Sequence, residues 1–171
     1  MQAHNLRRTI TKAFREKMRL ELKELYDPNI FSVQIKSILD GYRNPVKIKF
    51  NKLPAIFFGY GDARLNNSIQ TTTNSRGETV SLILYAVVNE IKGDDGRILK
   101  DDEGYPIGDK VSRAADMHDT LELFVKGIQH IGDTKVRKTR LASVRTLGGK
   151  LSDREFLEFR IELDITYKVF N

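Results

Sequence analysis

Residues 157–169 show the most regular pattern in the sequence, a strict alternation of apolar and polar side chains. Side chains on a β-strand point alternately to opposite faces of the sheet, so this pattern predicts one long strand with a core face and a charged face. A slip of one residue would bury the whole polar set, and the pairing of this strand is therefore strongly specified. The apolar positions are Leu157, Phe159, Ile161, Leu163, Ile165, Tyr167 and Val169, and the polar ones are Glu158, Arg160, Glu162, Asp164, Thr166 and Lys168.

Residues 79–91 form a second strand-like segment, and both of its faces are apolar. One face carries Val80, Leu82, Leu84, Ala86 and Val88, and the other carries Ile83, Tyr85, Val87 and Ile91. Antiparallel sheets commonly leave one face in water, so something must cover the second face of this strand. A helix of the same subunit and a neighbouring subunit both satisfy that need. In the second case Ile83, Tyr85 and Val87 form the subunit interface.

Two segments have the apolar period of an amphipathic helix. The first, residues 5–26, has a stripe that Ala13 and Leu25 widen, and its other face is rich in Arg and Lys. The second, residues 112–131, is closed by Gly132. The two stripes are Leu6, Ile10, Phe14, Met18, Leu22 and Tyr26 in the first helix, and Ala114, Met117, Leu121, Phe124, Ile128 and Ile131 in the second.

Shorter segments complete the expected fold. Residues 29–39 fit either a second short helix or an extended segment, whereas alternation over 46–50 and the apolar run 55–60 predict strands. Residues 66–77 read as a loop or hairpin tip. At 171 residues the chain suits one domain. We expect a single α+β domain over residues 1–171, with a mostly antiparallel sheet packed against a long N-terminal helix and a central helix.

A long polar loop is expected at residues 92–110, and it is acidic at its centre. An EF-hand calcium loop starting at Asp101 would need an oxygen ligand where Tyr105 stands and a glycine where Pro106 stands, so the calcium interpretation fails. Long loops are often functional, and we consider this one a candidate docking loop. Its acidic residues are Asp94, Asp95, Asp101, Asp102 and Glu103.

The residues that carry enzyme chemistry are sparse. The absence of cysteine excludes disulfides, Cys-ligated zinc and thiol nucleophiles. His118 and His130 are expected on one helix about 18 Å apart, too far to share a metal ion. His118 and Asp119 are neighbours on a helix and are not expected to face each other. We therefore expect a protein that is not an enzyme and has no catalytic residue, metal site or cofactor.

The net charge of +6, from 29 Lys and Arg against 23 Asp and Glu, permits contact with an acidic partner. Residues 134–150 contain no acidic side chain, which is the usual pattern of phosphate contact, but also no aromatic residue on which a base could stack. Specific DNA binding, non-specific proximity to DNA and a solvated basic face remain open. The cations considered are Lys135, Arg137, Lys138, Arg140 and Arg145. No apolar run long enough for a membrane span occurs, so we expect a soluble, non-secreted protein without a membrane partner.

The order of these elements resembles that of the tail-terminator, or tail-completion and head–tail joining, proteins of long-tailed bacteriophages. The resemblance covers nearly the whole chain, but it rests on element order, and segments 29–39 and 92–110 are additions to the pattern. The elements are the basic first helix, the strand Leu53-Pro54-Ala55-Ile56-Phe57-Phe58, a polar loop, the strand 79–91, the helix 112–131 and the final strand ending in Ile165-Thr166-Tyr167-Lys168-Val169.

The resemblance implies a hexameric ring of this structural protein on the end of a tail tube, which stops tube polymerisation and joins tail to head. The implied partners are copies of itself, the tail tube protein and the head connector or neck proteins, with double-stranded DNA passing through the lumen. The implied location is the tail–head junction of the virion, assembled in the host cytoplasm. The basic residues 135–145 would border the channel or meet the connector, and the acidic loop would order on docking. The alternative is a DNA-associated basic binding module.

Overall fold

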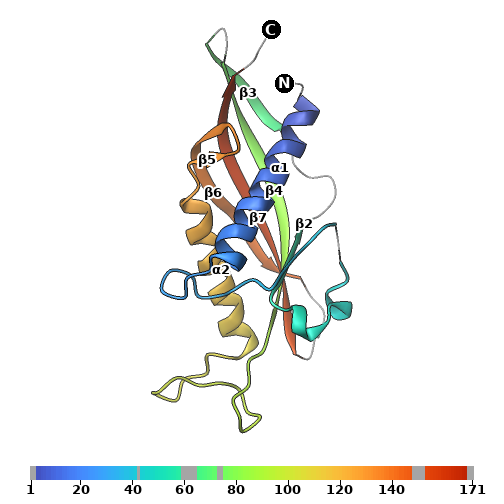
Figure 1. Ribbon diagram of the computed structural model, residues 1–171, viewed down its shortest axis with the longest axis vertical. Coiled ribbons are helices and arrows are strands. Elements are labelled where there is room, and N and C mark those ends of the chain that lie inside the picture. The colour runs from blue at the N-terminus through green and yellow to red at the C-terminus, as the bar shows by residue number, and fades with distance from the viewer. Residues whose placement is uncertain (1–2, 42, 59–64, 73–74, 148–152, 169–171) are drawn as a thin grey trace.

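Two long strands form the centre of a mostly antiparallel sheet (Figure 1). The structure, a computed structural model, describes residues 3–41, 43–58, 65–72, 75–147 and 153–168. Strands β4 (Ser75–Asn89) and β7 (Arg154–Lys168) pair along their whole length, from Ser75 opposite Lys168 to Asn89 opposite Arg154. The alternation at the end of the chain therefore predicted its strand correctly, and its odd-numbered side chains from Leu157 to Tyr167 are buried in the core.

The described residues form a seven-stranded sheet in the order β1-β2-β4-β7-β6-β5, with β3 also paired to β4. Among the strand pairs of the described residues, β1–β2 is parallel and all the others are antiparallel. One edge of β4 is shared, because β2 pairs with its second half and β3 with its first half. The remaining strands are β1 (Ser37–Leu39), β2 (Ala55–Phe58), β3 (Leu65–Thr72), β5 (His130–Ile131) and β6 (Thr134–Thr146).

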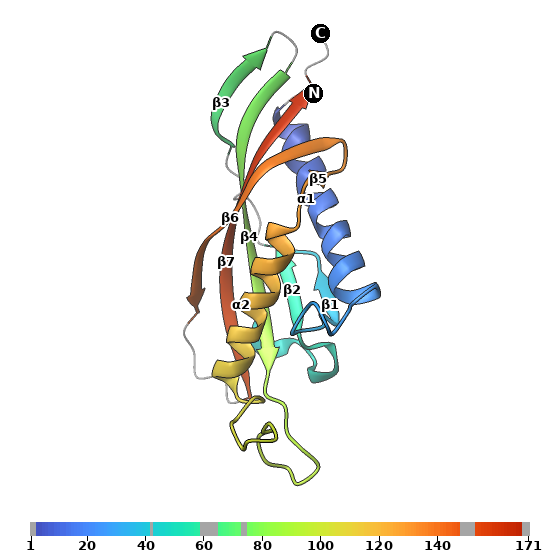
Figure 2. The same cartoon turned by 90° about the vertical axis from the view of Figure 1, so that its left-hand side faces the viewer.

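Helices α1 (Ala3–Arg19) and α2 (Lys110–Lys126) both cover the same face of the sheet (Figure 2). Every fourth residue of α1 is buried, as its period predicts. Phe14 lies at the centre of the core, with its ring edge-on to Phe58 of β2 at 6.1 Å and to Phe124 of α2 at 5.5 Å between centroids. This contact joins both helices to the sheet.

The helix predicted for residues 5–26 keeps α-geometry only to Arg19. A single π-helical turn, Leu20–Glu24, follows, and Leu25 donates its N–H to the Leu20 carbonyl oxygen five residues back, at 2.8 Å. Leu22 within this turn is still buried, as the stripe predicts, but the wider turn shifts the residues that follow it. Leu25, predicted on the buried stripe, is 69% exposed.

The helix predicted for residues 112–131 is displaced at both ends. It begins at Lys110 because the Asp109 carboxylate caps it, accepting from the backbone N–H groups of Val111 and Ser112. It ends at Lys126, and residues 130–131 form β5 instead. Gly132, which was predicted to close the helix, has φ of 55° and forms the turn between β5 and β6.

Three shorter predictions are corrected. Residues 29–39 contain no helix; residues 37–39 form β1, and the preceding segment is held by a bond from Val33 N–H to the Thr120 hydroxyl at 3.1 Å. The strand predicted over 46–50 is replaced by two 3₁₀ turns, Pro45–Lys47 and Phe50–Lys52. Residues 66–72 and 75–77, expected as a loop or hairpin tip, lie in β3 and β4, and residues 73–74 lie outside the described residues.

One buried polar pair crosses the sheet within the core. Tyr167 of β7 donates its hydroxyl to Glu78 Oε1 of β4 at 2.6 Å, and both side chains are buried. Burial, together with the hydrogen bond to Glu78, raises the pKa of Tyr167 to about 12. The neutral phenol is therefore the form that stabilises the fold.

We expect this pair to make the protein sensitive to alkali. An unfolded tyrosine titrates near 10, so stability from Tyr167 is fully present below pH ~10 and is lost as pH rises toward 12. The loss from this residue should reach about 2 kcal/mol. Urea unfolding at several pH values between 9 and 12 should show the wild-type protein losing more stability than the Tyr167→Phe variant. Parallel pH profiles for the two proteins would contradict this account.

Candidate assembly interface

Part of the sheet face opposite the helices is covered by this chain itself. Val87 has no exposed surface and belongs to a second apolar cluster. Ile48 and Leu53, from the segment with the two 3₁₀ turns, pack in the same cluster. The rings of Phe57, Tyr85 and Phe156 stack within it at 5.4 to 5.9 Å between centroids. The prediction that Val87 lies in a subunit interface is therefore wrong, because its side chain has no exposed surface with which a neighbouring subunit could make contact.

Arg154 fixes the covering segment in place. Its guanidinium is buried and donates from one terminal nitrogen to the carbonyl oxygens of Pro45 at 2.9 Å and Ile48 at 2.8 Å. It also pairs with the Asp153 carboxylate at 3.0 Å. The side-chain hydrogen bond from Arg154 lowers the pKa of Asp153, so this carboxylate is charged at neutral pH. Two carbonyl groups of an irregular segment thereby gain a charged donor.

Beyond the covering segment the second sheet face is more exposed. Ile83 is half-buried opposite Arg160 of β7. Tyr85, opposite Glu158, is also half-buried, and one side of its ring packs against the second cluster. Further along β4 the face becomes polar, where the Thr79 hydroxyl donates to Asp164 at 2.6 Å. This face therefore has an apolar strip at its centre with charged side chains beside it.

The basic residues of β6 do not form a uniformly positive surface. Arg140 pairs with Glu162, and Arg145 pairs with Glu158 at 3.1 Å. Lys138 lies opposite Asp164 in the register. Sequence reasoning missed these partners because they come from β7, outside the segment that it considered. The exposed Lys135 and Arg137 have no ion pair within the described part of the chain.

The acidic segment forms an arm, residues 91–109, that projects from one end of the molecule (Figure 1). Two backbone hydrogen bonds connect the segments at its base: Ile91 N–H donates to Gly108 O at 2.8 Å, and Leu99 N–H donates to Ile91 O at 2.9 Å. A Cβ atom on Gly108 would lie 2.2 Å from the Ile91 carbonyl oxygen, so this crossing requires glycine. The arm thus has a hydrogen-bonded fold of its own, and its ordering on docking stays a prediction.

The acidic residues of the arm have two different roles. Asp95 and Asp101 accept bonds from backbone N–H groups of the following turns, at 2.8 to 3.0 Å, and so hold the arm together. Asp94, Asp102 and Glu103 are exposed, and their carboxylates have no partner among the described residues. The arm also carries exposed apolar side chains, which are Leu99, Tyr105 and Ile107.

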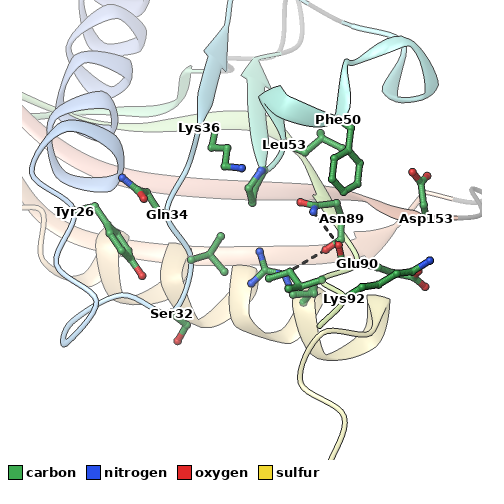
Figure 3. A pocket seen from close by; sticks show the side chains of 14 residues that line it. Tyr26, Ser32, Gln34, Lys36, Phe50, Leu53, Asn89, Glu90, Lys92 and Asp153 are labelled. Carbon is green, nitrogen blue, oxygen red and sulfur yellow. Dashed lines mark hydrogen bonds between the residues drawn. The ribbon is translucent and has the colours of Figure 1, made fainter. Parts of the chain in front are cut away.

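A cavity of about 760 Å³ lies at the base of the arm (Figure 3). Arg113 of α2 lines it and is only 8% exposed. Its Nε donates to the Asn89 carbonyl oxygen at 3.3 Å, and its nearest carboxylate, Asp116, is 3.9 Å away. Burial lowers the pKa of the Arg113 guanidinium and raises that of the nearby Tyr26 hydroxyl. The other lining residues are Ser32, Val33, Gln34, Lys36, Phe50, Leu53, Pro54, Asn89, Glu90, Ile91, Lys92 and Asp153.

None of the site residues predicted from the sequence lines this cavity. The sequence did contain one indication of this cavity, because Arg113 lies on the buried side of α2 together with Met117 and Phe124. A cation on an apolar stripe needs a partner, and that need pointed to a polar site. The rest of the lining comes from segments far apart in the sequence, which no local pattern could bring together.

The histidine predictions are also corrected. His130 lies in β5 and not on the helix of His118. His118 Nδ1 does approach Asp119 Oδ1, at 3.4 Å, because the two side chains bend toward each other although their Cα–Cβ bonds diverge. Together with Glu122 they offer ligand atoms within 4.8 Å of one another. The group lies on the outer side of one helical turn, and no second observation marks it as a metal site.

Comparison with models of known protein families gives no match, and comparison with curated protein sequences gives none either. Within the described residues, no helix combines the length and the apolar character that a bilayer crossing demands.

Proposed function

We propose that this chain is a structural protein that forms a ring with copies of itself, and that the ring caps a bacteriophage tail tube, ends its polymerisation and joins the tail to the head. The observation that carries the proposal is a half-buried apolar strip on the second sheet face, where Ile83 lies beside Tyr85 at the edge of the covered cluster, next to charged residues of β7. Half-buried apolar side chains in the middle of a sheet face are well suited to contact with another protein surface.

The charges beside the strip favour a specific contact. Glu158, Arg160 and Glu162 alternate in sign along β7, and such a pattern selects a partner surface of complementary pattern. A contact between two different surfaces of identical subunits is heterologous, and it generates a closed ring where the rotation permits. The hexameric number and the tube and connector partners come from the resemblance in element order.

The DNA-associated module has weaker support. Two arginines of β6 are paired with glutamates of β7, which reduces the positive potential available to phosphate. The exposed and unpaired Lys135 and Arg137 fit a non-specific role near DNA, as at the rim of a channel. A monomer whose DNA affinity falls steeply with salt would favour the module over the ring.

We expect the Ile83→Glu variant to lose assembly while keeping its fold, because a buried charge at the contact must be desolvated. The new carboxylate lies opposite Arg160 and is tolerated in the free subunit. Light scattering at several concentrations, and negative-stain images with and without tail tubes, should show rings and capped tubes for the wild type and isolated subunits for the variant. The matched control is Leu25→Glu, an exposed leucine on the helix side.

The control variant should assemble like the wild type, and urea unfolding should be unchanged for both. A wild-type protein that stays monomeric and neither forms rings nor caps tubes would overturn the proposal. So would assembly of Ile83→Glu at wild-type concentrations.

A further inference from the structure

The cavity at the base of the arm contains polar groups whose bonding capacity is unused. The terminal nitrogens of Arg113 donate no hydrogen bond within the described residues, and one of them forms a long ion pair with Asp116 at 3.9 Å. Asn89 is buried, its amide donates to the Glu90 carbonyl oxygen at 2.9 Å, and its Oδ1 has no partner. Leaving such groups unpaired costs stability, so the site suits an occupant that brings both an anion and hydrogen-bond donors.

The electrostatics of the cavity favour an anion. Lys36, Lys92 and Arg113 are its cations, against the carboxylates of Glu90 and Asp153. Asp153 pairs with Arg154 at 3.0 Å and Arg113 pairs with Asp116 at 3.9 Å, so Lys36 and Lys92 against Glu90 leave one excess positive charge at the wall. Phe50 adds an apolar rim, because it is 54% exposed and lines the same cavity (Figure 3).

The tip of the arm has the complementary features. Asp102 and Glu103 present carboxylates without partners among the described residues, and Tyr105 beside them is 64% exposed. The Tyr105 hydroxyl can supply a hydrogen-bond donor, whereas the backbone N–H groups of residues 103–105 already donate to Asp101. The turn is held by bonds to Asp101 Oδ1 at 2.8 and 3.0 Å, so little conformational entropy is lost when it binds.

The arm does not fill the cavity of its own chain. Residues 93–109 contribute nothing to the cavity wall, and the arm extends away from the body of the molecule (Figures 1 and 2). We propose that the tip of the arm, residues 101–105, docks in the cavity of a second copy, with Glu103 and Asp102 toward Arg113 and Lys36 and Tyr105 against Phe50. This inference rests on the proposed self-assembly and names a contact that would hold neighbouring subunits together.

The absence of cysteine from the chain makes a direct test possible. Glu103→Cys and Lys36→Cys are purified separately, mixed and oxidised gently. We expect a disulfide-linked heterodimer in at least tenfold higher yield than from Glu103→Cys mixed with Lys12→Cys, because ~1.4 kcal/mol of docking free energy gives that ratio. Lys12 is an exposed lysine on α1 and is absent from the cavity wall. Equal yields from the two mixtures would overturn the inference.

A second measurement uses the absence of tryptophan. Tyr105→Trp places a single reporter at an exposed position, and its emission should shift to the blue as protein concentration rises and the tip leaves water. Adding Lys36→Glu should abolish the shift, whereas adding Lys12→Glu should leave it. A shift that survives Lys36→Glu, or that never develops, counts against docking in the cavity.

Mass and electron microscopy on the same samples separate this inference from the proposed function. Rings that form without the Glu103–Lys36 cross-link refute arm docking and leave the ring in place. A cross-link that accumulates in closed dimers, with no ring or capped tube, supports docking and refutes the tail-terminator role.

Discussion

Replacing Phe14 with alanine is expected to lower the free energy of unfolding by about 4 kcal/mol, because a large buried side chain is removed and a cavity remains. Phe14 is fully buried and packs edge-on against Phe58 and Phe124. These contacts connect α1 to β2 and α2, so the neighbours cannot close the cavity without moving an entire helix. The loss is large compared with the ~5–15 kcal/mol by which domains of this kind are stable.

Leu25→Ala is the matched control, because Leu25 follows the same helix but is exposed. Its unfolding free energy should stay within about 0.5 kcal/mol of the wild type. Urea unfolding monitored by circular dichroism measures both variants. Similar losses in the two variants would mean that α1 is not fixed to the sheet through Phe14, and the core described above would need revision.

The elements that the sequence predicts well are those in which one periodic pattern matches one environment. In β7 every polar side chain between 158 and 168 faces away from the helices, so the period of two survives from end to end. In the first helical segment the period holds from Leu6 to Leu22, inside the π-helical turn, and fails at Leu25 directly after it. Nothing in the apolar spacing marks that turn.

The segment 45–52 shows why the same period of two can mislead. Val46, Ile48 and Phe50 alternate with lysines and asparagine, yet only Ile48 is buried. The Asn44 side chain accepts from Val46 N–H at 3.0 Å and starts a 3₁₀ turn, a local bond that competes with strand pairing. The second face of β4 is thus covered in part, and the cover is an irregular segment of the same chain with two 3₁₀ turns rather than a helix.

The candidate site was only partly accessible to sequence reasoning. Ile83 and Tyr85 follow from the two-sided pattern of β4, and the arm follows from its length and acidity. The pairing of Arg140 and Arg145 with β7 depends on the register between strands. The cavity depends on tertiary structure as well, because Lys36, Asn89 and Arg113 meet only when β1, β4 and α2 are assembled.

Arg154 provides the sharpest test of how the second sheet face is closed. We expect Arg154→Met to lower the free energy of unfolding by about 3 kcal/mol, since each hydrogen bond from a charged donor contributes roughly 1.5–3 kcal/mol. The carbonyl oxygens of Pro45 and Ile48 lose their donor, and the 45–52 segment is released from the cluster around Val87.

The released segment should be detectable directly, because Lys47, Lys49 and Lys52 are tryptic sites within it. In Arg154→Met, trypsin should cleave there faster than in the wild type under native conditions. Arg160→Met is the control, since Arg160 lies on the same face of β7 but is exposed, and its stability should change by less than about 0.5 kcal/mol. If Arg154→Met matched this control in both stability and cleavage, the segment would be held by apolar packing alone. Slow cleavage with reduced stability would instead locate the role of Arg154 in its pairing with Asp153.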